Sequence, residues 1–107
     1  MISTHILDTS LGTPAEGVPV KLQFKEGSTW KDLESGTTNL DGRFVFSSEK
    51  KAGLYQIIFE VEAYLKKHSK ESFYQSIPIP FKVENTNRKY HVPLLLNPFG
   101  FSTYRGS

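Results

Sequence analysis

Residues 90–107 read YHVPLLLNPFGFSTYRGS, a pattern typical of two strands joined by a tight turn. Alternation is clear over 90–96, and the turn is predicted at 97–100, where Asn, Pro and Gly gather. Chain ends are usually poorly ordered unless they are docked. The large aromatic rings of this ending favour burial, so we expect it to be ordered. Gly106 permits close backbone approach, and Arg105 can hold a planar acceptor through paired hydrogen bonds, which together predict a functional site.

Further strands follow from alternating apolar residues elsewhere in the chain. The clearest is 18–25, in which one face carries Val18, Val20, Leu22 and Phe24. Weaker patterns predict strands over 2–7, 30–36, 43–46, 54–61 and 77–83. Residues 8–17 are expected to form a loop. Pro78 and Pro80 remove amide donors on one side of the last of these strands, which therefore should lie at a sheet edge.

One segment breaks the strand pattern. Val61, Tyr64 and Leu65 have helical spacing, and the lysines that follow suit a helix C-terminus. Residues 1–107 therefore predict a single all-β domain, an antiparallel β-sandwich of roughly seven or eight short strands with one short helix.

Composition excludes several function classes. The net charge is +2 and the lysines are dispersed among glutamates, so no basic stripe suggests nucleic acid. The chain has no cysteine, which excludes a disulfide framework and thiolate chemistry. Metal-binding spacings and phosphate-binding glycine loops are missing, so we expect no metal and no cofactor. No targeting or membrane-spanning pattern is apparent, and we expect a soluble, cytoplasmic protein with no membrane partner.

Two histidines are candidates for chemistry. His5 and His91 lie in predicted strands among apolar neighbours, and imidazoles that titrate near neutrality could take a proton from water and return it to a leaving nitrogen. The alternative is that each is a hydrogen-bonded core histidine. Arg43 follows an Asp-Gly turn that could aim it into a cleft, although a surface charge is also possible. His68 is expected to be solvated.

The end of the chain supplies the remaining candidates. Tyr104, Arg105 and Ser107 surround Gly106, and together they suggest a docked segment that contacts a ligand. A segment docked only for stability or for contact between subunits is the alternative.

With these residues in view, the chain resembles the transthyretin-like family, and within it the 5-hydroxyisourate hydrolases of urate breakdown. The similarity covers STHILDTS at 3–10, GVPV at 17–20, DGR at 41–43 and the whole of 90–107. The ending Tyr-Arg-Gly-Ser resembles the hydrolases and differs from the hormone-carrying transthyretins. Phe99 and Phe101 occupy positions where the family commonly has tyrosine.

The resemblance implies a homotetramer, a dimer of dimers, with substrate clefts between the dimers. It implies catalytic roles for His5, His91, Arg43 and Ser107, and substrate binding by His5, Arg43, Tyr104 and Arg105. In the reaction it implies, the histidines activate a water that opens the lactam ring of 5-hydroxyisourate, and either histidine could be the base. A non-catalytic carrier of a small aromatic ligand, or a structural module for protein contacts, is the alternative.

Overall fold

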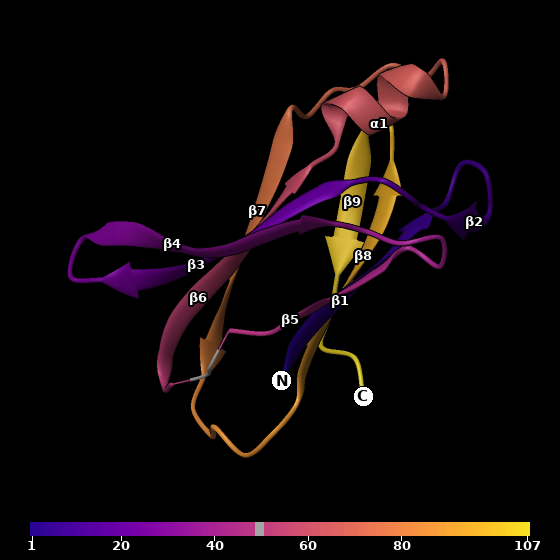
Figure 1. Ribbon diagram of the computed structural model, residues 1–107. Helices are drawn as coiled ribbons and strands as arrows, with labels where there is room; N and C mark the ends of the chain where they lie inside the picture. The colour runs from indigo at the N-terminus through magenta and orange to yellow at the C-terminus, as the bar shows by residue number, and fades with distance from the viewer. Residues whose placement is uncertain (49–50) are drawn as a thin grey trace.

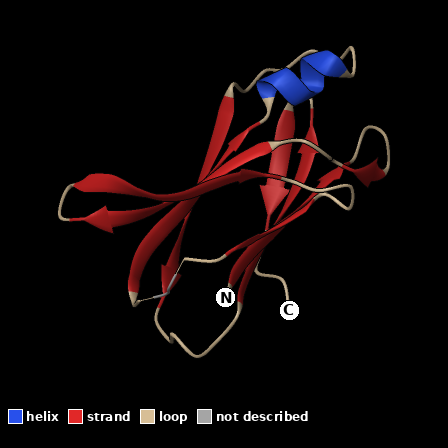
Figure 2. Ribbon diagram, in the orientation of Figure 1, coloured by secondary structure: helices blue, strands red, loops and turns tan. Residues whose placement is uncertain are grey.

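Two β-sheets packed face to face form the computed structural model, which describes residues 1–48 and 51–107 (Figures 1 and 2). The strands are β1 (Ile2–Asp8), β2 (Thr13–Pro14), β3 (Pro19–Glu26), β4 (Thr29–Thr37), β5 (Arg43–Phe46), β6 (Gly53–Glu60), β7 (Ser76–Val83), β8 (Tyr90–Asn97) and β9 (Gly100–Thr103), with helix α1 (Glu62–Lys67) between β6 and β7. The predicted all-β sandwich with one short helix is confirmed. The additional strand is β2, a two-residue pairing within the segment predicted as a loop.

The order of the strands places β1 inside one sheet. That sheet runs β2-β1-β8-β9, and β5 shares with β2 the edge of β1 that faces away from β8. The second sheet runs β4-β3-β6-β7. All pairs are antiparallel except β1 with β8, which is parallel and joins the two ends of the described chain side by side (Figure 1). This one parallel pair differs from the antiparallel pattern predicted, and it brings segments far apart in sequence into register.

The core lies between the sheets and is made by alternate residues of each strand. In β1 and β3 every second residue is buried, as the sequence pattern predicts. The largest fully buried side chains come from both sheets, from α1 and from the loop just before β3: Tyr55, Phe59, Ile2, Ile6, Leu22, Ile57, Leu65, Ile77, Leu94, Leu96, Val18 and Val20. The residues between them face outward, so the side chains on the outer face of each sheet are a different set from those of the core.

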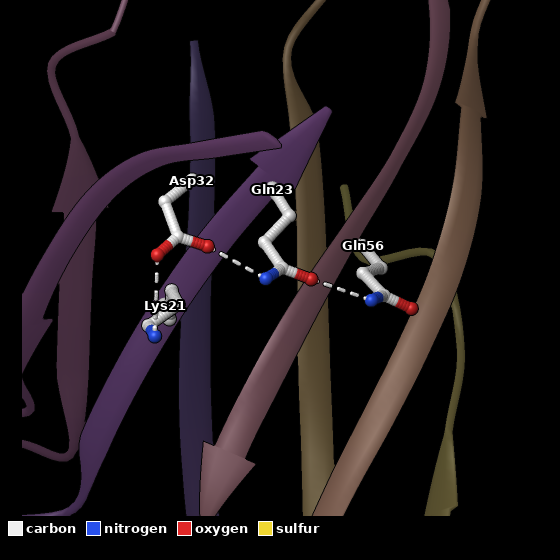
Figure 3. Close-up of polar contacts among 4 residues, drawn as sticks. All are labelled: Lys21, Gln23, Asp32 and Gln56. Atoms are coloured by element: carbon white, nitrogen blue, oxygen red, sulfur yellow. Dashed lines mark hydrogen bonds and ion pairs between the residues drawn. The ribbon is translucent and has the colours of Figure 1, made fainter. Parts of the chain in front are cut away.

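The outer face of the four-stranded sheet is tied together by its own polar side chains (Figure 3). The Gln56 amide donates to Gln23 Oε1 at 2.6 Å, and the Gln23 amide donates to Asp32 Oδ1 at 2.7 Å. Lys21 Nζ lies 3.5 Å from Asp32 Oδ2. These contacts link β4, β3 and β6 on the side of the sheet that faces away from the core.

β7 is an edge strand of the four-stranded sheet. β7 pairs with β6 along its length, from Ser76 to Val83, and among the described residues no strand lies on its other side. Pro78 and Pro80 are both exposed there, and the edge position predicted from them is confirmed.

In the described part of the chain, no helix has the length and apolar content needed to cross a membrane.

The aromatic ending is less buried than the sequence suggested. Phe99 is 63% exposed, Phe101 38% and Tyr104 57%, so the expected burial of these rings is wrong for the single chain. The reason is that β9 is the outermost strand of its sheet, with Phe99 in the turn just before it and Tyr104 just after it. Tyr74 packs edge-on against Phe101 at 5.4 Å and gives it partial cover. These rings form an exposed apolar edge.

Candidate active site

Three strands place three of the four predicted catalytic side chains on one outer face. Residues that oppose each other in a sheet point to the same side. His5 of β1 opposes Arg43 of β5, and Ser3 of β1 opposes His91 of β8. Ser3 and His5 are two apart on β1, so all four side chains share the outer face of the five-stranded sheet. The parallel β1–β8 pairing thus brings together two histidines from opposite ends of the sequence.

His91 is held on both sides of its ring. Its Nδ1 lies 2.8 Å from the hydroxyl oxygen of Ser3. Gly106 lies against the opposite edge, so closely that a Cβ there would be 2.5 Å from His91 Cδ2. In the described residues no side-chain nitrogen or oxygen is both buried and unpaired. The remaining ring nitrogen, Nε2, therefore opens to solvent on the outer face.

The surroundings of His91 favour its neutral form. Burial of the half-buried ring lowers its pKa from the ordinary value of 6.5, and the positive charges of Arg43 and His5 lower the pKa further. Desolvation and like charges both disfavour the imidazolium. A neutral imidazole with an open nitrogen can accept a proton at neutral pH.

The ending is docked across β8, as predicted. The amide of Gly106 donates to the carbonyl oxygen of His91 at 2.8 Å, and the two residues form an isolated antiparallel bridge. The Thr103 hydroxyl donates to the Pro93 carbonyl at 2.7 Å. The close approach predicted for Gly106 is found at the His91 ring.

A pocket opens beside these groups, which we call the site pocket. It measures about 210 Å³ and is lined by Met1, Ser3, Thr4, Arg43, Val45, Lys89, His91 and Ser107. His5 does not line it, although it lies on the same face opposite Arg43. Two cationic side chains beside an imidazole and a hydroxyl suit a planar ligand rich in carbonyl oxygens.

Tyr104 and Arg105 lie elsewhere in the single chain. They line a second pocket of about 240 Å³, the edge pocket, with residues of β7, β8 and β9. The Arg105 guanidinium lies 4.7 Å from the centre of the Tyr90 ring and donates to the Lys89 carbonyl at 3.2 Å. His91 lines both pockets. The predicted residues other than His5 are therefore divided between two pockets that share His91.

Sequence reasoning did not single out Ser3 or Lys89, which both line the site pocket. For Ser3 a signal existed, because it shares a face with His5 in an alternating strand. The pattern does not show that His91 is the hydrogen-bond partner of Ser3.

No group of three His, Cys, Asp or Glu residues in the described ranges is arranged to hold a metal ion.

A sequence model of the HIUase/Transthyretin family matches residues 2–106. The chain belongs to this family. A 5-hydroxyisourate hydrolase of Salmonella typhimurium is 43% identical over 110 residues, which cover 100% of this chain and 81% of that protein. The resemblance predicted from the residues is confirmed.

Solved structures of the family extend this comparison. The 5-hydroxyisourate hydrolase of Klebsiella pneumoniae superposes with a TM-score of 0.86 at 40% identity, covering 99% of this chain and 98% of that one. Sea bream transthyretin in complex with thyroxine superposes at 0.91 with 27% identity, covering 98% and 93%. The family's common fold is therefore shared with a hydrolase and with a hormone-binding protein, while the sequence is nearer to the hydrolases.

Proposed function

We propose that this protein hydrolyses 5-hydroxyisourate, opening its six-membered ring to give 2-oxo-4-hydroxy-4-carboxy-5-ureidoimidazoline in urate degradation. The observation that carries the proposal is the meeting of His91, Arg43 and His5 on one outer face, with His91 kept neutral and open to solvent. The relatives named above as 5-hydroxyisourate hydrolases support the same substrate.

In the proposed reaction, His91 Nε2 takes a proton from a water molecule. The water oxygen then bonds to the lactam carbonyl carbon, and the carbonyl oxygen becomes negatively charged. When the carbon–nitrogen bond breaks, the imidazolium returns its proton to the leaving nitrogen. The lowered pKa of His91 supports its role as the base, and His5 helps to position the water or the substrate.

Arg43 supplies the positive charge that the transition state requires. Arg43 and His91 line the same site pocket, so the guanidinium can reach a substrate bound there. A fixed donor aimed at a developing oxyanion contributes about 3 kcal/mol. Ser107 would orient the substrate in the site pocket, and Tyr104 and Arg105 would bind its planar ring from the neighbouring pocket.

We also propose a homotetramer, a dimer of dimers, with the site between dimers. The outer face that carries the histidines is open in the single chain, and the exposed rings of Phe99, Phe101 and Tyr104 leave an apolar edge to cover. Contact across that face would bring a second wall to the site pocket. The mass in solution tests this assembly. The cytoplasmic location stays a prediction from the sequence.

A carrier function is the alternative, because sea bream transthyretin binds thyroxine on the same fold. A carrier needs neither a neutral imidazole nor a cation beside it. The identity is 43% with a hydrolase and 27% with this transthyretin, which favours the enzyme.

The test generates 5-hydroxyisourate from urate with urate oxidase and follows its absorbance with and without the protein. We expect the wild type to accelerate the decay and His91→Asn, shown to be folded by circular dichroism, to lose most of this acceleration. Unchanged decay with the wild type would exclude the activity. Full activity in folded His91→Asn would exclude His91 as the base. Retention of substrate or thyroxine without turnover would support the carrier.

A further inference from the structure

We propose that Ser3 is a positioning residue for His91: its hydroxyl oxygen accepts the Nδ1 proton and so leaves Nε2 as the reactive nitrogen. This inference rests on the proposed function for the direction of the hydrogen bond and for its catalytic consequence, while the contact between the two side chains does not. The observation that carries it is the 2.8 Å separation between Ser3 Oγ and His91 Nδ1. The parallel register of β1 and β8, which pairs the two residues, fixes this contact.

The direction of the hydrogen bond follows from the role of the base. A neutral imidazole carries one proton, so Nε2 can accept another only when the proton is on Nδ1. Nδ1–H then needs an acceptor, and the Ser3 hydroxyl is the side chain beside it. After Nε2 is protonated, Nδ1–H still donates to the same oxygen. The bond therefore persists through the cycle and strengthens when the ring is charged.

A serine suits this position better than a carboxylate would. The pKa of His91 is already lowered by burial and by the charges of Arg43 and His5. A carboxylate at Ser3 would raise that pKa and hold the ring as imidazolium at neutral pH. A hydroxyl orients the ring without adding charge. In the described residues Ser3 Oγ makes no other side-chain hydrogen bond, so it is available for this role.

The ring is fixed from its other edge as well. Gly106 meets Cδ2, and Pro93 lies beside the same glycine. The charged side chains that lower the pKa of His91 or line a pocket with it come from several elements: His5 from β1, Arg43 from β5, Lys82 from β7, Lys89 just before β8 and Arg105 from the final segment. All of these are cationic or can become so. Ser3 is thus the neutral acceptor among groups that oppose protonation of His91.

The experiment compares Ser3→Ala, Ser3→Thr and a matched control, Ser35→Ala, which lies on an exposed position of β4 in the other sheet. We expect Ser3→Ala to lower kcat roughly 10- to 100-fold, the size of a hydrogen bond to a charged group, with little change in KM. Removing the acceptor destabilises the imidazolium, so the acid limb of the pH profile of kcat/KM should move to lower pH. Ser3→Thr, which keeps the hydroxyl, should retain activity within about threefold, and Ser35→Ala should match the wild type.

Imidazole ¹⁵N spectra supply a readout that does not need turnover. We expect the wild type to show His91 as the Nδ1–H form at neutral pH, and Ser3→Ala to show a lower His91 pKa, with His91→Asn used to assign the signals. An Nε2–H form in the wild type, or an unchanged pH limb and unchanged kcat in Ser3→Ala, would overturn the proposal. A wild type that shows the Nδ1–H form yet hydrolyses nothing would refute the proposed function and leave the positioning contact intact.

Discussion

Replacing Gly106 with alanine should damage the site while sparing the fold. An alanine Cβ at this position would lie 2.5 Å from His91 Cδ2 and 3.1 Å from Pro93 Cγ. Ordinary contacts begin at 3.4 Å, so the methyl group and the ring must separate from 2.5 Å to at least 3.4 Å, a shift of about 0.9 Å. The imidazole is held from its other side by Ser3, so either the ring or the ending must move.

The expected magnitude follows from this displacement. A misplacement of about 1 Å at a reacting group can reduce the rate roughly 100-fold. We therefore expect kcat/KM of Gly106→Ala for 5-hydroxyisourate to fall roughly 10- to 100-fold. If the bridge between Gly106 and the His91 carbonyl is also lost, the free energy of unfolding should fall by about 1 kcal/mol. For a chain of this length that corresponds to a melting temperature lower by about 4 °C.

Gly100→Ala is the matched control, because it makes the same substitution in the same final segment. A Cβ at Gly100 would meet no atom closer than Asn97 Oδ1, at 3.9 Å. Steady-state kinetics and thermal unfolding of both variants test the reasoning. Wild-type kcat/KM in Gly106→Ala would refute the steric argument. An equal loss in Gly100→Ala would show that the segment is sensitive to any change, and would refute the specific contact with His91.

Three further predictions concern charge. Arg43→Ala should lower kcat roughly 100-fold or more through loss of oxyanion stabilisation. The same substitution should raise the pKa of His91 and move the acid limb of the kcat/KM profile to higher pH. An acid limb at the wild-type pH would contradict the effect of Arg43 on His91. The pKa of His91 in the folded protein lies below the ordinary 6.5, so between these two pKa values the unfolded chain binds more protons than the folded chain. The free energy of unfolding should therefore fall as the pH drops from 6.5 through the pKa of the folded protein. Chemical denaturation should show a smaller fall in His91→Asn. Asp8 is buried and accepts the Tyr64 hydroxyl at 2.8 Å, so Asp8→Ala should cost about 3 kcal/mol in denaturant unfolding, and a loss below about 1 kcal/mol would contradict it.

Much of the fold could be predicted because inward and outward residues alternate regularly in strands such as β1 and β3. In β3, Val20, Leu22 and Phe24 face the core between polar neighbours, and this alternation predicts a strand with one buried face. Pro78 and Pro80 likewise indicate an edge, since neither can donate to a neighbouring strand. The short β2 escaped prediction because its two residues, Thr13 and Pro14, are too few to show any period.

Strand partners were harder to predict than strands. Alternation of apolar and polar residues predicts which face of the sheet a residue occupies, but it does not predict which strand pairs with its own. The contact between Ser3 and His91 depends on a parallel pairing across 88 positions of sequence, and no local pattern encodes that register. The same holds for His5 and Arg43. The candidate histidines were found from their residue type, while the group that positions one of them needed the coordinates.

The division between the two faces explains how one sandwich can serve different functions. Ile2, Thr4 and Ile6 of β1 are buried and hold the sheets together, whereas Ser3 and His5 between them face outward. Substituting the outward residues leaves the core unchanged, so a hydrolase and a thyroxine-binding transthyretin can share this fold at TM-scores of 0.86 and 0.91 to this chain. We therefore expect the activity to depend on the outer face, and a chain with the same core but an apolar residue at each outward position of β1 should fold normally and hydrolyse nothing.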